Sequence, residues 1–91
     1  MTKGMRRCEQ RKLEKCVPSD VDGSEVEEIV LNSASEMGYE VEDEYDTQQV
    51  GGGVMHNVKV VNSEGRSAWI HFNRPSSEYA SNKGEWFWYI M

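Results

Sequence analysis

The chain has 91 residues and a mass of 10.5 kDa, which is enough for one domain with a thin two-layer core. Its net charge is −6 and only 37% of its residues are apolar. A chain of this size has no room for a large cleft between two lobes. It also contains no run of about 18 apolar residues, so no membrane span is predicted. The basic N-terminal stretch lacks the apolar region that would make it a secretory signal.

Charge is unevenly distributed along the chain. Residues 1–15 contain six Lys or Arg and two Glu, whereas residues 16–58 contain eleven Asp or Glu and no Lys or Arg. Residues 1–19 are predicted to form a basic N-terminal tail, helical in part, because their apolar residues form no sustained stripe and Pro18 would end a helix. We expect this tail to contribute little to the stability of a single domain formed by residues 20–91.

A main helix is predicted over residues 22–37. Two overlapping capping boxes precede it, Asp22-x-x-Glu25 and Ser24-x-x-Glu27, and Gly38 provides a left-handed stop. Val26, Ile29 and Val30 begin an apolar face along this helix.

Four strands are predicted over residues 39–46, 54–61, 66–73 and 85–91, with a polar loop over residues 74–84. Their connections are too short for parallel crossovers, so the predicted sheet is an antiparallel meander. One face of this sheet is covered by the helix, which gives a two-layer α+β fold in the order α-β-β-β-β. In the third strand, Ala68, Ile70 and Phe72 share one side, which we expect to face the helix, and Trp69 and His71 share the other.

The residue types that carry catalysis or bind metals do not occur at recognisable spacings. Cys8 and Cys16, together with His56 and His71, match no zinc-binding template. We expect both thiols to be reduced, although a disulfide between them would be open to the chain in an oxidising setting. Residues 51–53 are three glycines followed by a strand rather than by a phosphate-binding helix. No catalytic residue, metal or cofactor is therefore predicted.

The sharpest functional signal is a row of acidic residues in the first predicted strand. Alternation places Glu40, Glu42, Glu44 and Asp46 on one side of it. Such a row either protects an exposed sheet edge against aggregation or forms a surface that binds a basic partner. In the second interpretation the helix acids reinforce the row, and two tyrosines supply anchors. The predicted partner-binding residues are Asp22, Glu25, Glu28, Tyr39, Glu40, Glu42, Glu44, Tyr45 and Asp46.

The aromatic residues suggest an alternative surface. One helix cannot cover both faces of a four-stranded sheet, so Trp69, Trp86 and Trp88 are candidates for stacking on nucleic-acid bases. In this alternative the protein is a small nucleic-acid-binding module that uses the basic tail for phosphates. The net charge of −6 opposes it, and the segregated basic segment favours it. A third possibility is a homo-oligomer that pairs edge strands.

In size, acidity and lack of catalytic motifs, the chain resembles the small acidic inhibitors of phages and mobile elements, such as anti-restriction and anti-CRISPR proteins. It is also similar in these respects to the acidic immunity proteins that neutralise nuclease toxins. The resemblance involves no shared motif. It implies a non-enzymatic inhibitor, a monomer or homodimer in the cytoplasm of a bacterial or phage-infected cell. Such an inhibitor would block a basic, nucleic-acid-handling surface of a protein partner as a loose mimic of nucleic acid.

Overall fold

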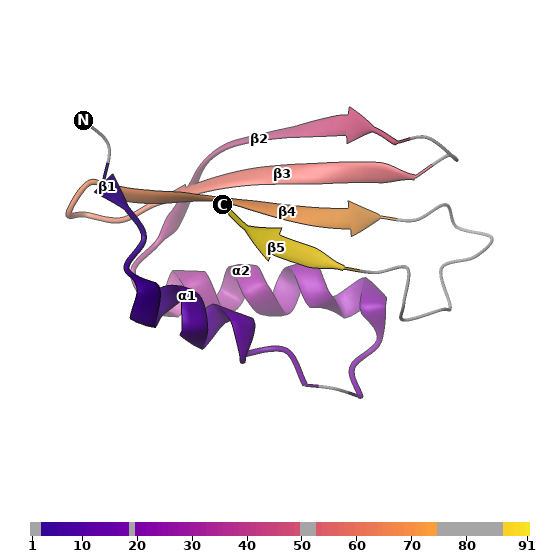
Figure 1. The fold of residues 1–91 in the computed structure, drawn as a ribbon, viewed down its shortest axis with the longest axis horizontal. Coiled ribbons are helices and arrows are strands. Elements are labelled where there is room, and N and C mark those ends of the chain that lie inside the picture. The colour runs from indigo at the N-terminus through magenta and orange to yellow at the C-terminus, as the bar shows by residue number, and fades with distance from the viewer. Residues whose placement is uncertain (1–2, 19, 50–52, 75–86) are drawn as a thin grey trace.

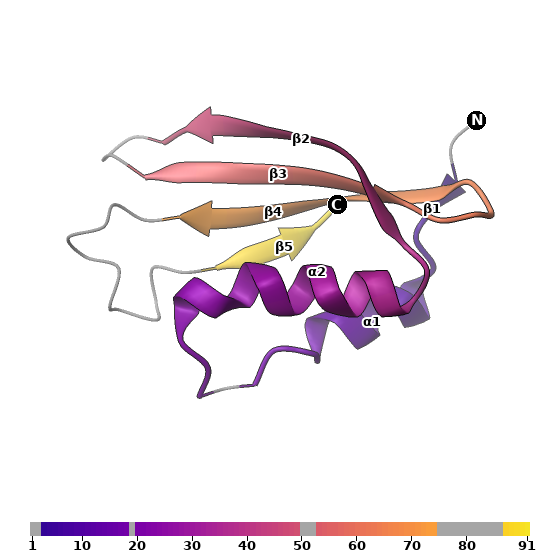
Figure 2. The same cartoon turned by 180° about the vertical axis from the view of Figure 1, so that it is seen from behind.

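The computed structural model describes residues 3–18, 20–49, 53–74 and 87–91. Within them, two helices and a five-stranded mixed sheet form an α+β fold, with both helices on one side of the sheet (Figures 1 and 2). The helices are α1 (Arg7–Glu14) and α2 (Val26–Glu36), and a 3₁₀ turn, η1 (Gly23–Glu25), precedes α2. The strands are β1 (Lys3–Gly4), β2 (Glu40–Gln48), β3 (Val54–Val61), β4 (Arg66–Arg74) and β5 (Trp88–Ile90).

The predicted antiparallel meander is present from β2 to β5. Each of these strands pairs with the next one in the chain, and β2 forms an outer edge of the sheet. The prediction of four strands was incomplete, because β1 adds a short parallel pairing to β4 through Lys3 and Gly4. A two-residue pairing has no room for an alternating pattern, so the sequence carries no signal for it.

The N-terminal stretch that was predicted to be a tail is part of the packed structure. It forms β1 and α1, and the side chains of Met5 and Leu13 are buried in the core, with Leu13 fully inaccessible to solvent. The expectation that this stretch contributes little to the fold is therefore corrected. An eight-residue helix can dock through a single leucine, which leaves no repeating apolar stripe in the sequence.

Helix α2 occupies most of the predicted range, but it begins differently. Residues 23–25 form η1, and Glu25 at the N-cap makes no side-chain capping hydrogen bond. The predicted stop is confirmed, because Gly38 has a φ of 91°, in the left-handed region that glycine tolerates. Val30 and Ala34 are the buried residues of α2.

The core lies between the helices and one face of the sheet. Ala68, Ile70 and Phe72 on β4 are buried there. On β3, Val60 lies opposite Ala68 and Val58 lies opposite Ile70. The predicted orientation of β4 is confirmed. The sheet face that carries Trp69 and His71 points away from the helices, and we call it the open face.

Replacing Leu13 with alanine should destabilise the protein by about 2–5 kcal/mol, because it empties a fully buried site that joins α1 to the core. A thermal melt should show a midpoint lowered by roughly 4–8 °C for each kcal/mol. The exposed neighbour Lys12 is the matched control, and Lys12→Ala should leave the midpoint nearly unchanged. An unaltered melt for Leu13→Ala would show that α1 is dispensable for the fold.

Candidate binding surface

Strand β2 is the most acidic element of the fold. It lies at the edge of the sheet, and all nine of its residues are exposed. Five of them are carboxylates: Glu40, Glu42, Asp43, Glu44 and Asp46. The strand and its exposure agree with the sequence-based interpretation of an acidic edge.

The carboxylates of β2 do not form the predicted single row. The pairing with β3 changes register between Val41 and Asp43, so a β-bulge interrupts the alternation. Glu40 lies opposite Val61, whereas Glu44 lies opposite Val58, which is buried under the helices. Residues that are paired across an antiparallel sheet share a face, so Glu40 and Glu44 project to opposite faces.

At the bulge, Glu42 forms an ion pair with a lysine of the neighbouring strand. Its Oε2 lies 3.3 Å from Nζ of Lys59 on β3. This contact neutralises part of the strand's charge, so Glu42 is less available to a partner than its place in the sequence suggests.

His56 on β3 is the centre of a cluster that joins β2 to α2. Its Nδ1 lies 2.5 Å from Oδ1 of Asp46, and its Nε2 lies 3.3 Å from Oε1 of Glu27 on α2. Oε2 of Glu44 lies 3.8 Å from the same Nε2. Carboxylates from β2 and α2 therefore face both nitrogens of this buried ring, and His56 links the two elements.

Glu27 is held from the other side by Arg74 of β4. The guanidinium group donates from Nη2 to both carboxylate oxygens at 2.8 Å and from Nε to Oε2 at 3.1 Å. Sequence reasoning used Glu27 only as a helix-start residue and missed this role. Its partners, His56 and Arg74, lie far from it in the sequence, so no local pattern identifies them.

Asp46 is the carboxylate whose pKa responds most clearly to this cluster. The hydrogen bond with His56 holds the pKa of Asp46 below its ordinary value of 3.8, and the nearby positive charges of His56 and Arg74 act in the same direction. Asp46 therefore stays ionised over a wider pH range than a free aspartate does.

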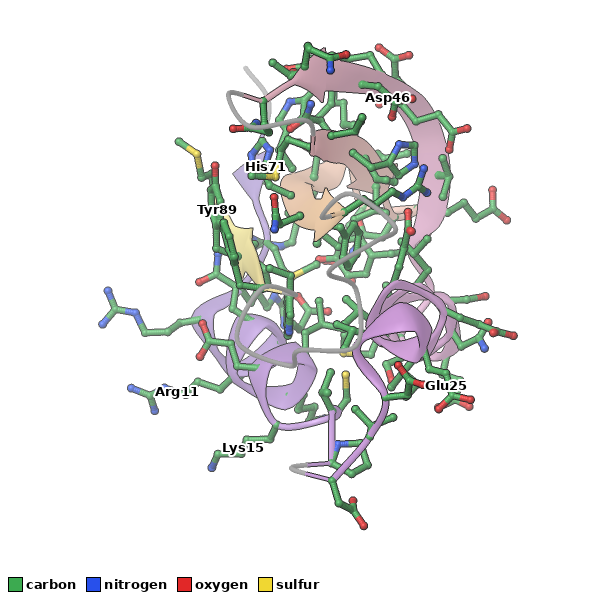
Figure 3. The ribbon with its side chains drawn as sticks, turned by 90° about the vertical axis from the view of Figure 1, so that its right-hand side faces the viewer. Arg11, Lys15, Glu25, Asp46, His71 and Tyr89 are labelled. Atoms are coloured by element: carbon green, nitrogen blue, oxygen red, sulfur yellow. The ribbon has the colours of Figure 1, made fainter. Side chains whose placement is uncertain are left out.

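The remaining predicted acids of the helix region are exposed. Glu25 and Glu28 make no side-chain hydrogen bond or ion pair with the described residues, and Asp22 is exposed just before η1. We use the name acidic surface for Glu25, Glu28, Glu44 and Asp46. Glu25 and Asp46 lie on the right of Figure 3, away from Arg11 and Lys15.

Tyr39 does not belong to this surface, contrary to the sequence-based prediction. Only 1% of the residue is exposed, and its hydroxyl donates a 2.9 Å hydrogen bond to Oε1 of Glu9 on α1. Burial, and then this hydrogen bond, raise the pKa of Tyr39 to about 12. Tyr39 thus ties α1 to the start of β2 and cannot anchor a partner.

Tyr45 is 52% exposed, as an anchor requires, but it projects to the open face. There its ring contacts Trp69 edge to face, with the ring centres 5.4 Å apart. Trp88 stacks near Phe72 on the helix-facing side, with ring centres 6.3 Å apart, so the two tryptophans do not share one surface. Trp86 lies outside the described residues.

The described residues offer little to metal chemistry. They contain no group of three or more His, Cys, Asp or Glu placed to bind a metal ion, and the thiols of Cys8 and Cys16 are free. A cavity of about 10 Å³ between Glu27, Phe72 and Arg74 has room for one water molecule. Among the same residues, no helix has both the length and the apolar character needed to cross a membrane.

Comparisons with protein-family models, curated protein sequences and solved structures find no match for this chain. The contacts described above are therefore the basis on which its function is inferred.

Replacing Asp46 with asparagine should remove a pH-dependent contribution to stability. Because the folded-state pKa is lowered, that contribution is present above the ordinary value of 3.8 and is lost as the pH falls through the lowered value. Urea unfolding should separate wild type from Asp46→Asn near neutral pH and bring them together in acid. NMR titration of the Asp46 carboxyl in His56→Gln should show the pKa returning toward 3.8. An unshifted pKa in that variant would contradict the role of His56.

Ultraviolet absorbance should show that one of the four tyrosines ionises late, near pH 12, and that Tyr39→Phe removes this component. Because the folded-state pKa is raised, the stabilisation from the neutral ring is complete below the ordinary value of 10 and is lost as the pH rises through about 12. Tyr45→Phe is the control, since Tyr45 is half exposed and lacks this hydrogen bond. If Tyr39→Phe instead removed a tyrosine that ionises near the ordinary value of 10, the Tyr39 hydroxyl would be exposed to solvent, contrary to the structure.

Proposed function

We propose that this protein is a non-enzymatic binding protein that uses its acidic surface to block a basic surface on a protein partner. The observation that carries the proposal is the placement of Glu25 at the end of η1, Glu28 on α2, and Glu44 and Asp46 on β2. His56 on β3 links α2 to β2 through Glu27, Glu44 and Asp46. A surface of this kind attracts Lys- and Arg-rich grooves and speeds association with them at low ionic strength.

Two features make the carboxylates suitable for binding rather than only for solubility. Glu44 and Asp46 are 59% and 57% exposed in their side chains, yet both lie near the buried ring of His56. A partner would therefore meet carboxylates that are already oriented, which lowers the entropic cost of binding. Glu25 and Glu28 add charge at the positive end of α2, where acids also stabilise the helix.

The partner class that fits best is an enzyme or complex that handles nucleic acid, because its groove is built for closely spaced negative charge. An inhibitor of this kind corresponds to the anti-restriction, anti-CRISPR and immunity types that the chain resembles in size and charge. Val41 on β2 is about half exposed, lies on the same side of the strand as Glu44 and Asp46, and supplies apolar contact beside the carboxylates.

The test is an inhibition assay against a panel of restriction nucleases, RNA-guided nucleases and nuclease toxins. We expect at least one enzyme to be inhibited in competition with its nucleic-acid substrate, and more weakly at high salt. The double variant Glu25→Lys/Glu28→Lys should reduce that inhibition at least about tenfold, because it replaces attraction with repulsion. Both residues are exposed, so the variant should stay folded, with its stability lowered only by the lost interaction with the helix dipole, about 0.3–1 kcal/mol for each residue.

The matched control is Glu14→Lys/Glu36→Lys, which changes the net charge equally at exposed positions on α1 and at the far end of α2. It should inhibit as the wild type does. If inhibition decreased equally in both double variants, the effect would be due to net charge and not to the acidic surface. Inhibition that persists in both would favour the other interpretation of β2, in which its acids only protect an exposed edge.

A further inference from the structure

The open face carries a set of residues that line up across four strands. Tyr45, Asn57, His71 and Tyr89 are successive pairing partners from β2 to β5, so their side chains share one face. Both helices pack on the opposite side of the sheet (Figures 1 and 2). This row lies apart from the acidic surface and has no role in the function proposed above.

A hydrogen bond from Asn57 fixes the orientation of the His71 ring. Its amide, only 3% exposed as a residue, donates a 2.9 Å hydrogen bond to Oγ1 of Thr47 and a 3.2 Å bond to the carbonyl oxygen of Tyr45. The amide oxygen therefore accepts from Nδ1 of His71, 2.5 Å away. His71 is held as the tautomer with its proton on Nδ1, and burial lowers its pKa, which favours the neutral ring.

Two exposed tyrosines extend the aromatic surface on either side of His71. The ring of Tyr89 stacks on His71 with centres 4.7 Å apart and planes 27° from parallel, and Tyr89 is 43% exposed. On the other side, Tyr45 is 52% exposed and contacts Trp69 edge to face. Aromatic rings held on a sheet in this way are the platforms on which single-stranded nucleic acids stack their bases.

Unpaired cations lie beside the Tyr89 end of this platform. Arg7, Arg11, Lys12 and Lys15 are exposed on α1 and just after it, and none forms a side-chain hydrogen bond or ion pair with the described residues. Glu14 is the one exposed acid of α1, and with residues 88–90 of β5 it lines a depression of about 350 Å³ between the two elements. Figure 3 shows Arg11 and Lys15 on the same side as Tyr89, and Asp46 and Glu25 on the other.

We propose that the open face, together with the cations of α1, binds a single-stranded nucleic acid. Bases stack on Tyr89 and on the Tyr45–Trp69 pair, and the backbone phosphates contact Arg11 and its neighbours on α1. The net charge of −6 does not prevent this, because the acidic surface lies on the opposite side of the molecule and charge is screened beyond about 10 Å at moderate salt. Glu40 and Asp43 of β2 do share the open face, opposite Val61 and Lys59, so the phosphates are placed at the other end of the platform, beside Tyr89 and α1. An acidic peptide would satisfy the cations but would leave the aromatic rings uncovered.

The experiment measures fluorescence anisotropy of fluorescein-labelled oligo(dT) and oligo(U) of about 15 nucleotides, titrated with the full chain. We expect binding whose affinity falls with salt. Tyr89→Ala should weaken it by roughly 5- to 150-fold, the range for one stacked base, while Tyr89→Phe should retain it. Arg11→Gln/Lys15→Gln should lower the slope of log K against log salt by about 0.7 for each phosphate that is no longer neutralised.

Control variants distinguish binding at this platform from a general effect of charge or of folding. Arg6→Gln removes a cation that is already paired with Glu64, at 3.3 Å, and should affect binding less than Arg11→Gln does. Glu25→Lys/Glu28→Lys should retain or strengthen oligonucleotide binding, so the failure of one proposal is distinguishable from the failure of the other. Circular dichroism melts of Tyr89→Ala and Tyr89→Phe should agree, so that weaker binding is not the result of unfolding.

Three results would overturn the proposal. The first is the absence of binding to either oligonucleotide at low salt. The second is unchanged binding in Tyr89→Ala, which would mean that the cations act alone. The third is equal competition by poly-glutamate at the same charge concentration, which would identify an acidic protein rather than a nucleic acid as the occupant of this side.

Discussion

The structure depends on a core in which apolar side chains are buried on only one face of the sheet, under the helices. The part of the chain that the structure describes forms two short helices, and both pack on the same face of the sheet, where Leu13, Val30 and Ile70 are fully buried. A domain this small buries too little surface to spare any of these contacts. Within the described residues, neither helix packs on the open face, and the edge strand β2 is exposed along its whole length. The aromatic row lies on that face, and β2 contributes Glu44 and Asp46 to the acidic surface.

His56 shows how a polar cluster can be kept at the border of such a core. The ring is buried and faces carboxylates from β2 and α2, while Arg74 neutralises Glu27. Buried charges cost desolvation energy, so this arrangement is a weak argument for stability and a better one for specificity. It links α2 to β2 and holds the carboxylates of Glu44 and Asp46 beside the ring of His56.

The two surfaces have opposite character, and the order of the chain produces this separation. Arg11 and Lys15 lie on the same side of the molecule as Tyr89, whereas Glu25 and Asp46 lie on the other (Figure 3). A partner of the acidic surface and a nucleic acid on the open face would therefore not compete for the same residues.

The sequence by itself determined the class of fold, the extent of β3, the stop at Gly38 and the inward face of β4, because alternation and local turn chemistry specify them. Only the tertiary structure decided the rest. The bulge after Val41 separates Glu40 from Glu44, and Tyr39 is buried against α1 because a helix expected to be a tail docks there. The partners of His56 and the aromatic row of the open face depend on strand register, which brings together residues far apart in the chain and leaves no local trace in the sequence.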